Sequence, residues 1–136
     1  MQLNPYLSFN GQCDAAFKFY EKALGGKIAF KMIYGESPMA KDFPPETHKQ
    51  IMHVRLLVGG QVLMGSDSPC GRYEKPQGFN VTLGFEKPEE AERVFKALSE
   101  GGQVKMPIEE TFWAHRFGML TDQFGIPWMV NCEKSN

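Results

Sequence analysis

Two residues of one short apolar run have side chains that could bind a ligand or move a proton. His53 lies between Met52 and Val54, and Arg55 follows two positions later. Because every second side chain of a strand points to the same face, His53 and Arg55 would share a face. The imidazole could be a base or a metal ligand, and the guanidinium could anchor a carboxylate or a phosphate. On the outer face of a sheet, both would instead be structural or solvated residues.

A second histidine is flanked by aromatic residues at alternate positions. Trp113, His115 and Phe117 would lie on one face of a strand, where two aromatic rings and an imidazole could line a small-molecule pocket. The same pattern is compatible with Trp113 and Phe117 in a core and His115 held by a backbone carbonyl. The sequence leaves both interpretations open.

Two more residues are candidate ligand contacts, and two other polar residues are not candidates for catalysis. Asn80 lies in a predicted strand, where asparagine is unfavourable, which favours a specific polar role. Met129 has a flexible thioether that suits an adaptable apolar pocket and equally a core. Asp122, followed by Gly125, is typical of a chain reversal rather than of catalysis. Ser66 has no suitably spaced base, so no catalytic residue is identified.

Neither a metal nor an organic cofactor is indicated by these patterns. Cys13, Cys70 and Cys132 are odd in number and widely spaced, and no CxxC pair occurs, so neither a disulfide framework nor a zinc knuckle is predicted. No Gly-rich strand-to-helix turn of the GxG type is present to hold a nucleoside cofactor. We therefore expect the protein to work without a cofactor.

The composition is typical of a folded domain whose partner is a neutral small molecule or another protein. The chain has 136 residues, 42% of them hydrophobic and 12% aromatic, which is enough for one domain with a substantial core. The net charge of −1 gives no reason to expect nucleic acid as a partner. No apolar run is long enough to span a membrane, and the amino terminus does not resemble a signal peptide. We expect a cytoplasmic protein that binds a small molecule.

These residues must be positioned by strands and two helices. Apolar stripes at helical spacing predict helices over 12–24 and from Pro88 to about residue 100, the first ended by Gly25-Gly26 and the second by Gly101-Gly102. Segment 35–49 contains three prolines and is predicted to be a loop or lid. Strands are predicted over 3–9, 27–34, 51–58, 61–66, 78–85 and 103–106, and a hairpin over 111–132 that reverses at 122–125.

The two halves of the chain repeat at an offset of 76 residues. Matching pairs share the same structural role and include Leu7/Leu83, Phe9/Phe85, Ala15/Ala91, Phe19/Phe95 and Gly25-Gly26/Gly101-Gly102. The repeat predicts an α+β domain over 1–136 made of two βαβββ modules, about 1–72 and 76–134. One module alone could not cover its apolar sheet face, which favours pairing of the two.

Four motifs accompany the tandem repeat: NPYLSFNG at 4–11, FYEKALGG at 19–26, ETFWAHRFG at 110–118 and TDQFGIPWMVN at 121–131. With these motifs the chain resembles the vicinal oxygen chelate superfamily, which includes glyoxalase I, extradiol dioxygenases and bleomycin-resistance proteins. The similarity is greatest to its PhnB-like branch. The resemblance implies a cup of curved mixed sheet whose concave face is the binding site, and a homodimer.

The resemblance also predicts where a metal would bind. Metal-dependent relatives take their ligands from the first and last strand of each module, which corresponds here to Asn4 or Pro5, His53 or Arg55, Asn80 and Met129. Only His53 among these is a good ligand for a first-row metal. We therefore expect a metal-independent protein that binds a small molecule through His53, Arg55, Asn80, Trp113, His115, Phe117 and Met129.

Two other functions remain open at this point. One is a metal-dependent lyase or dioxygenase that uses His53 together with ligands from a partner chain. The other is an antibiotic-sequestering dimer, which needs an aromatic groove and no chemistry.

Overall fold

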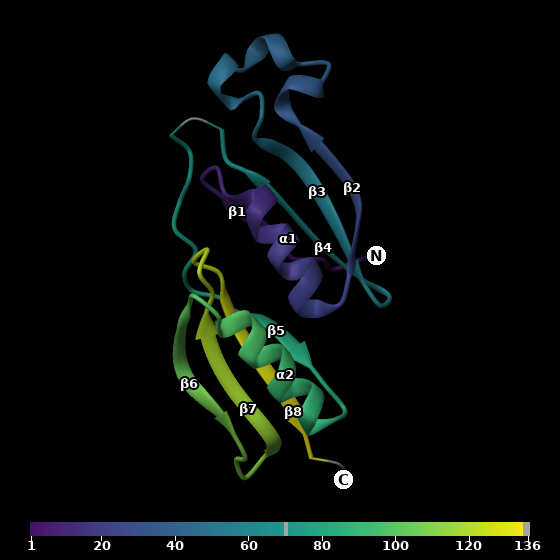
Figure 1. Cartoon of the computed structure of the whole chain (residues 1–136), viewed down its shortest axis with the longest axis vertical. Helices are drawn as coiled ribbons and strands as arrows, with labels where there is room; N and C mark the ends of the chain where they lie inside the picture. The colour runs from purple at the N-terminus through teal and green to yellow at the C-terminus, as the bar shows by residue number, and fades with distance from the viewer. Residues whose placement is uncertain (70, 135–136) are drawn as a thin grey trace. The chain divides into compact units, whose positions relative to one another are not determined.

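The computed structural model describes residues 1–69 and 71–134, and the chain divides into two compact units, Met1–Glu74 and Lys75–Asn136. Each unit contains one four-stranded mixed sheet with one long helix against one face (Figure 1). The boundary falls between the predicted modules 1–72 and 76–134. The predicted α+β class with two tandem βαβββ modules is confirmed.

In the first unit the strands lie in the order β1-β4-β3-β2. The outer strand β1 runs parallel to β4, and the other neighbours are antiparallel. Gly59 takes a φ of 59° in the two-residue turn between β3 and β4, a conformation that glycine adopts readily. The elements are β1 (Tyr6–Phe9), α1 (Cys13–Leu24), β2 (Lys27–Ile33), β3 (Ile51–Val58) and β4 (Gln61–Asp67).

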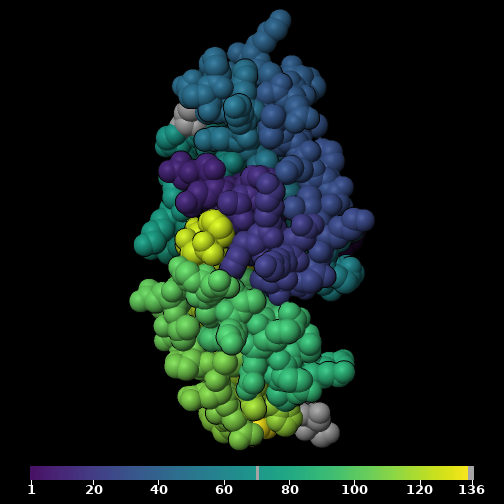
Figure 2. Space-filling view, viewed as in Figure 1, coloured from purple at the N-terminus to yellow at the C-terminus, as the bar shows by residue number. Residues whose placement is uncertain are grey.

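The core of the first unit lies between α1 and its sheet. The helix buries Ala16, Phe17 and Tyr20, and the sheet presents Val54 and Leu56 to them. Phe17 packs directly on the backbone of β4, since a Cβ built at Gly65 would lie 2.9 Å from its ring. Gly65 is therefore required for the helix to approach this closely. A space-filling view in the same orientation shows the atoms of the α1 and α2 segments on the side that faces the viewer (Figure 2).

The second unit repeats this topology, with the order β5-β8-β7-β6 and β5 parallel to β8. Helix α2 begins at Pro88, as the sequence predicts, with Glu89 and Glu90 in its first turn, where they complement the helix dipole. The close contact of helix and sheet recurs here, because a Cβ at Gly118 would lie 2.7 Å from the ring of Phe95. The elements are β5 (Val81–Gly84), α2 (Pro88–Ser99), β6 (Gln103–Glu109), β7 (Ala114–Thr121) and β8 (Pro127–Glu133).

Several strand ends differ from the sequence prediction. The first strand begins at Tyr6 rather than residue 3, and Leu3 is 95% exposed because no neighbouring strand pairs with it. The fifth strand begins at Val81 rather than residue 78. Trp113 precedes β7, while β6 continues to Glu109 through its pairing with β7.

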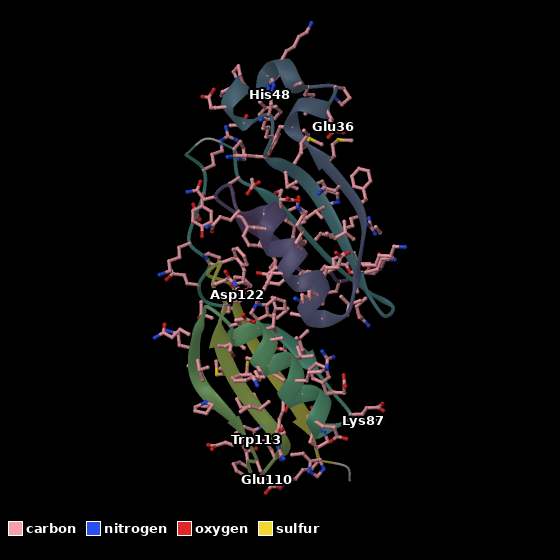
Figure 3. All side chains as sticks on the ribbon, in the orientation of Figure 1. Glu36, His48, Lys87, Glu110, Trp113 and Asp122 are labelled. Atoms are coloured by element: carbon pink, nitrogen blue, oxygen red, sulfur yellow. The ribbon has the colours of Figure 1, made fainter. Side chains whose placement is uncertain are left out.

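The segment predicted as a loop over 35–49 forms three single 3-10 turns, η1 (Tyr34–Glu36), η2 (Ala40–Asp42) and η3 (Pro45–Thr47). His48 lies among these turns (Figure 3), with Nε2 at 2.9 Å from the carbonyl oxygen of Ala40 and 3.0 Å from that of Phe43. The ring of Phe43 packs on that of Tyr34 at 4.6 Å. Among the described residues, no helix is long and apolar enough to cross a membrane.

Candidate functional site

The first candidate surface is the face of the first sheet opposite α1, which we call the first open face. Val54 and Leu56 of β3 are buried under the helix, so the alternate residues of this strand point to the other side. These include His53 and Arg55, which share a face as the alternation predicts. His53 is half-buried and Arg55 is exposed.

A tyrosine that the sequence analysis did not select joins His53 on this face. The hydroxyl of Tyr6 lies 3.3 Å from Nδ1 of His53, and the two rings stack with centroids 5.8 Å apart. In the tautomer with the proton on Nε2, the hydroxyl donates to Nδ1 and leaves the Nε2–H free to donate to a ligand. Tyr6 is on β1, two strands from His53, whereas Phe30 is on β2, the strand next to β3, and its ring centroid lies 6.0 Å from that of the imidazole.

The first open face carries three large apolar side chains that are partly exposed. Tyr6 is 47% exposed, Phe30 43% and Leu57 40%, although all three carry large apolar groups. Hydrophobic side chains left uncovered on a sheet face mark a surface that another molecule covers. Arg55 supplies a positive charge at the same surface, next to Met64 in the strand register. This face combines apolar area, a hydrogen-bonded imidazole and a cation.

The second candidate surface is the face of the second sheet opposite α2, the second open face. Trp128, Val130 and Cys132 of β8 are buried, so Met129 and Asn131 point to the other side. Their partners across the ladder are Met119 and Phe117 of β7, and Thr82 and Gly84 of β5. The Thr82 hydroxyl lies 3.9 Å from the sulfur of Met129. Met129 and Phe117, both predicted site residues, therefore lie on this face.

The predicted common face of Trp113, His115 and Phe117 is interrupted. The register between β7 and β8 shifts between Ala114 and Arg116, so His115 is an extra residue in the ladder and simple alternation fails there. The shift lets Nε of Arg116 reach the Glu92 carboxylate of α2 at 2.6 Å, on the helix side. The rings of Trp113 and Phe117 remain in contact, with centroids 5.5 Å apart.

Asn80 lies one residue before β5 and is exposed, so it is outside the strand in which the sequence analysis placed it. Sequence reasoning missed Tyr6 and Asn131. Both could have been found by alternation, since Asn131 is two residues after Met129 and Tyr6 lies in a strand whose alternate residues Leu7 and Phe9 are buried.

The positions that would hold a metal have the wrong donor atoms. His53 and Arg55 lie on β3, not on the last strand of the first module as the sequence analysis assumed, because β4 follows. The positions on the two open faces at the first and last strands are Tyr6, Ser8, Met64, Ser66, Thr82, Met129 and Asn131, with Glu133 at the exposed end of β8.

Apart from the single carboxylate of Glu133, these positions carry phenol, hydroxyl, thioether and amide groups. Such groups are poor ligands for first-row divalent metals, which favour imidazole, carboxylate and thiolate groups. Within residues 1–69 and 71–134, no three His, Cys, Asp or Glu side chains come together in an arrangement that could hold a metal ion. The residues at these positions do not fit the metal that metal-dependent relatives bind there.

Comparison with known proteins places the whole chain in one group. A family model described as the Glyoxalase/Bleomycin resistance protein/Dioxygenase superfamily matches residues 2–130. Protein YjdN of Escherichia coli (strain K12) is 38% identical over 144 residues, covering 98% of this chain and 97% of that protein. The crystal structure of PA1353 from Pseudomonas aeruginosa has 47% identity and a TM-score of 0.90, with 99% of both chains covered. A PhnB protein from Bacillus cereus, with 23% identity, a TM-score of 0.80 and coverage of 97% and 99%, shares the fold.

Proposed function

Because the chain belongs to the Glyoxalase/Bleomycin resistance protein/Dioxygenase superfamily, we propose that it binds a small, partly apolar molecule on its open sheet faces without a metal. The observation that carries this proposal is the hydrogen-bonded Tyr6–His53 pair in the middle of exposed aromatic surface. A pocket for a small molecule usually combines apolar walls with a few fixed polar groups, and this surface has both.

Each residue of the first open face has a role in this proposal. The rings of Tyr6 and Phe30 provide apolar area on either side of the imidazole, with centroids 5.8 and 6.0 Å from that of His53. The Tyr6 hydroxyl fixes the imidazole, so that His53 presents its other ring nitrogen to the ligand. Arg55 provides a positive charge that pairs with an acidic group of the ligand. We assign binding, and no reaction, to these groups.

The donor atoms at the first and last strands support the metal-independent part of the proposal. A lyase or dioxygenase of the metal-dependent type needs ligands such as imidazole and carboxylate groups at those positions. In this chain they are replaced by Tyr6, Met64, Thr82 and Met129, which suit contacts with an organic ligand.

We also propose that the protein is a homodimer of the cytoplasm. Large apolar side chains such as Phe112, 88% exposed, and Phe30, 43% exposed, are typical of surfaces that another chain covers. The buried free thiols of Cys13 and Cys132 are in keeping with a reducing compartment. Size-exclusion chromatography with light scattering should give twice the chain mass of 15.4 kDa, and a monomer would contradict the dimer.

A ligand screen by thermal shift tests the binding proposal. The screen should use small aromatic amides and carboxylates with the wild-type protein, followed by titration of every hit. Tyr6→Phe removes only the hydroxyl that fixes His53, and Arg55→Gln removes the cation. Lys22→Gln is the matched control, because it removes one positive charge from the exposed surface of α1.

We expect compounds that bind the wild type and the Lys22→Gln control to bind at least five-fold more weakly to Tyr6→Phe or to Arg55→Gln. The proposal is wrong if no compound stabilises the protein, or if the affinities of all hits are unchanged in both variants.

A further inference from the structure

One polar atom on the second open face has no partner in the protein. Within the described part of the chain, Oδ1 of Asn131 is the one buried side-chain oxygen or nitrogen without a hydrogen bond. A buried amide oxygen without a donor costs free energy, because it has lost its contact with water and gained nothing in exchange. Such an atom calls for a partner that supplies an N–H or O–H group.

The orientation of this amide is fixed by its neighbour. Nδ2 of Asn131 lies 3.5 Å from Oε1 of Glu133, where it donates to the carboxylate. A flipped amide would bring two oxygens together at that place, which is unfavourable. The nitrogen therefore faces Glu133, and the oxygen is the end of the amide that needs a donor.

The surface next to Asn131 leaves room for a ligand. In the parallel ladder of β5 and β8, the residue in register with Asn131 is Gly84. A Cβ built at Gly84 would meet no atom within 4 Å, and its φ is not in the left-handed region. Neither close packing nor backbone conformation requires glycine here. The absence of a side chain creates a niche beside the amide.

An aromatic wall adjoins the niche on the other strand. Phe117 is the cross-strand partner of Asn131, and its ring contacts that of Trp113, which is 46% exposed. The charges nearby are negative, since Glu133 lies beside the amide and Glu109 is paired with Phe117 across β6 and β7. This side of the site favours a planar, apolar and neutral or cationic group over an anionic one.

We infer that Asn131 is a specificity-determining residue, whose Oδ1 accepts a hydrogen bond from an N–H or O–H donor on a planar ligand seated over Gly84 and against Phe117. The inference rests on the proposed function and narrows its ligand class. The ligand is an aromatic or heteroaromatic compound with a donor such as an amide, an amino group or a ring N–H. A carboxylate on the same molecule would lie away from Glu133.

Two probes of almost equal shape test this inference. Benzamide carries an NH2 group where acetophenone carries a methyl group, so the pair differs mainly in the hydrogen-bond donor. Each is titrated into uniformly 15N-labelled wild-type protein, and chemical shifts of residues 84, 117 and 131 report on this face. The variants are Asn131→Leu, which removes the acceptor at similar volume, and Gly84→Val, which fills the niche with a residue that strands favour.

We expect benzamide to bind the wild type about ten-fold more tightly than acetophenone, the effect of one hydrogen bond to a buried acceptor. Asn131→Leu should bring the two affinities within two-fold of each other. Gly84→Val should keep the wild-type melting temperature and abolish the shifts from both probes. Should Asn131→Leu fail to fold, Gly84→Val and the comparison of the two probes on the wild type still decide the matter.

Equal affinity of both probes for this face of the wild-type protein would overturn the inference and leave the proposed function standing, because both compounds would still bind an open sheet face. Shifts on neither open face, with either probe, would contradict the proposed function as well.

Discussion

The indole N–H of Trp128 donates to Oδ2 of Asp122 at 2.9 Å, inside the core of the second unit. The other carboxylate oxygen, Oδ1, accepts the backbone N–H groups of Phe124 at 2.8 Å and Ile126 at 3.0 Å. Asp122 lies at the turn between β7 and β8 (Figure 3) and is 4% exposed. One carboxylate therefore joins the turn to the largest fully buried side chain.

Replacing this carboxylate should destabilise the protein. Asp122→Ala removes three acceptor contacts and leaves the buried indole N–H without this partner, so we expect the free energy of unfolding to fall by about 3 kcal/mol. An NH2 group cannot accept from the indole N–H, so Asp122→Asn should lose nearly as much stability if its NH2 group faces the indole. Urea unfolding followed by tryptophan fluorescence measures the change. The control Gln123→Ala, in the same turn and exposed, should change it by less than about 0.5 kcal/mol. An Asp122→Ala variant with the free energy of unfolding of the wild type would disprove this account.

A second buried carboxylate holds the first unit together. Oδ1 of Asp67 accepts the backbone N–H groups of Gly11 at 2.8 Å and Cys13 at 3.0 Å, and Oδ2 accepts that of Ile51 at 2.9 Å. Asp67→Ala should lower the free energy of unfolding by about 3 kcal/mol, since three backbone donors lose their partner, and those of Cys13 and Ile51 are buried. Chemical denaturation of Ser66→Ala, one residue earlier on the open face, should match wild type. Similar losses in both variants would refute the assignment.

Cys13 should be unreactive in the folded protein. Burial raises the pKa of its thiol, and the carboxylates of Asp67 and Asp14 raise that pKa further. Because the thiolate is the reactive form, iodoacetamide at pH 8 should alkylate Cys13 only after unfolding, as measured by peptide mass spectrometry. Modification of Cys13 in the native protein at the rate of a model thiol would contradict the burial.

The raised pKa also has a defined effect on stability. Above about pH 8.5 the unfolded thiol ionises while the folded one stays protonated, so the unfolded state binds fewer protons and stability falls as pH rises. The fall between pH 8 and 10 should be smaller in Cys13→Ala than in wild type. Equal slopes in urea unfolding would show that the thiol does not contribute.

His48 should control local order in segment 34–49. Its Nε2 lies within hydrogen-bond distance of two backbone carbonyls, at 2.9 and 3.0 Å, and a replacement by alanine leaves these turns without that link. We expect His48→Ala to raise amide hydrogen exchange across residues 35–50 and to leave the exchange of β7 and β8 unchanged. The control Glu46→Ala is exposed and should exchange like wild type. Uniform exchange changes along the whole chain would argue against a local role.

Features that depend on local sequence were predictable. The helix start at Pro88 and the end of α1 at Gly25 follow from neighbouring residues, and the structure has both. The predicted offset of 76 residues holds for the starts of β2 and β6, Lys27 and Gln103. The helices start at Cys13 and Pro88, 75 residues apart, so the buried Ala91 corresponds to the buried Ala16 and not, as the repeat predicted, to the exposed Ala15. The one-residue register shift at His115 was not predictable, because it accompanies the contact of Arg116 with Glu92 on α2. Simple alternation cannot foresee a bulge that tertiary contacts select.

The candidate site was predictable only in part for the same reason. His53 and Arg55 follow from alternation along one strand, but the partner of His53 is Tyr6, 47 residues away. That pairing depends on the strand order β1-β4-β3, which places the first strand two positions from the third. Residues far apart in sequence meet through topology, which the periodicity of a single strand does not encode.

The most direct test of metal-independent binding is calorimetric titration of the best hit from the thermal-shift screen into protein treated with EDTA. Metal content is verified by mass spectrometry, and the titration is repeated after addition of Zn, Ni, Mn or Fe(II). We predict one dissociation constant, the same within two-fold with and without metal, and no rise in melting temperature with any ion. Binding that requires one equivalent of a particular ion, which also raises the melting temperature, would contradict the account.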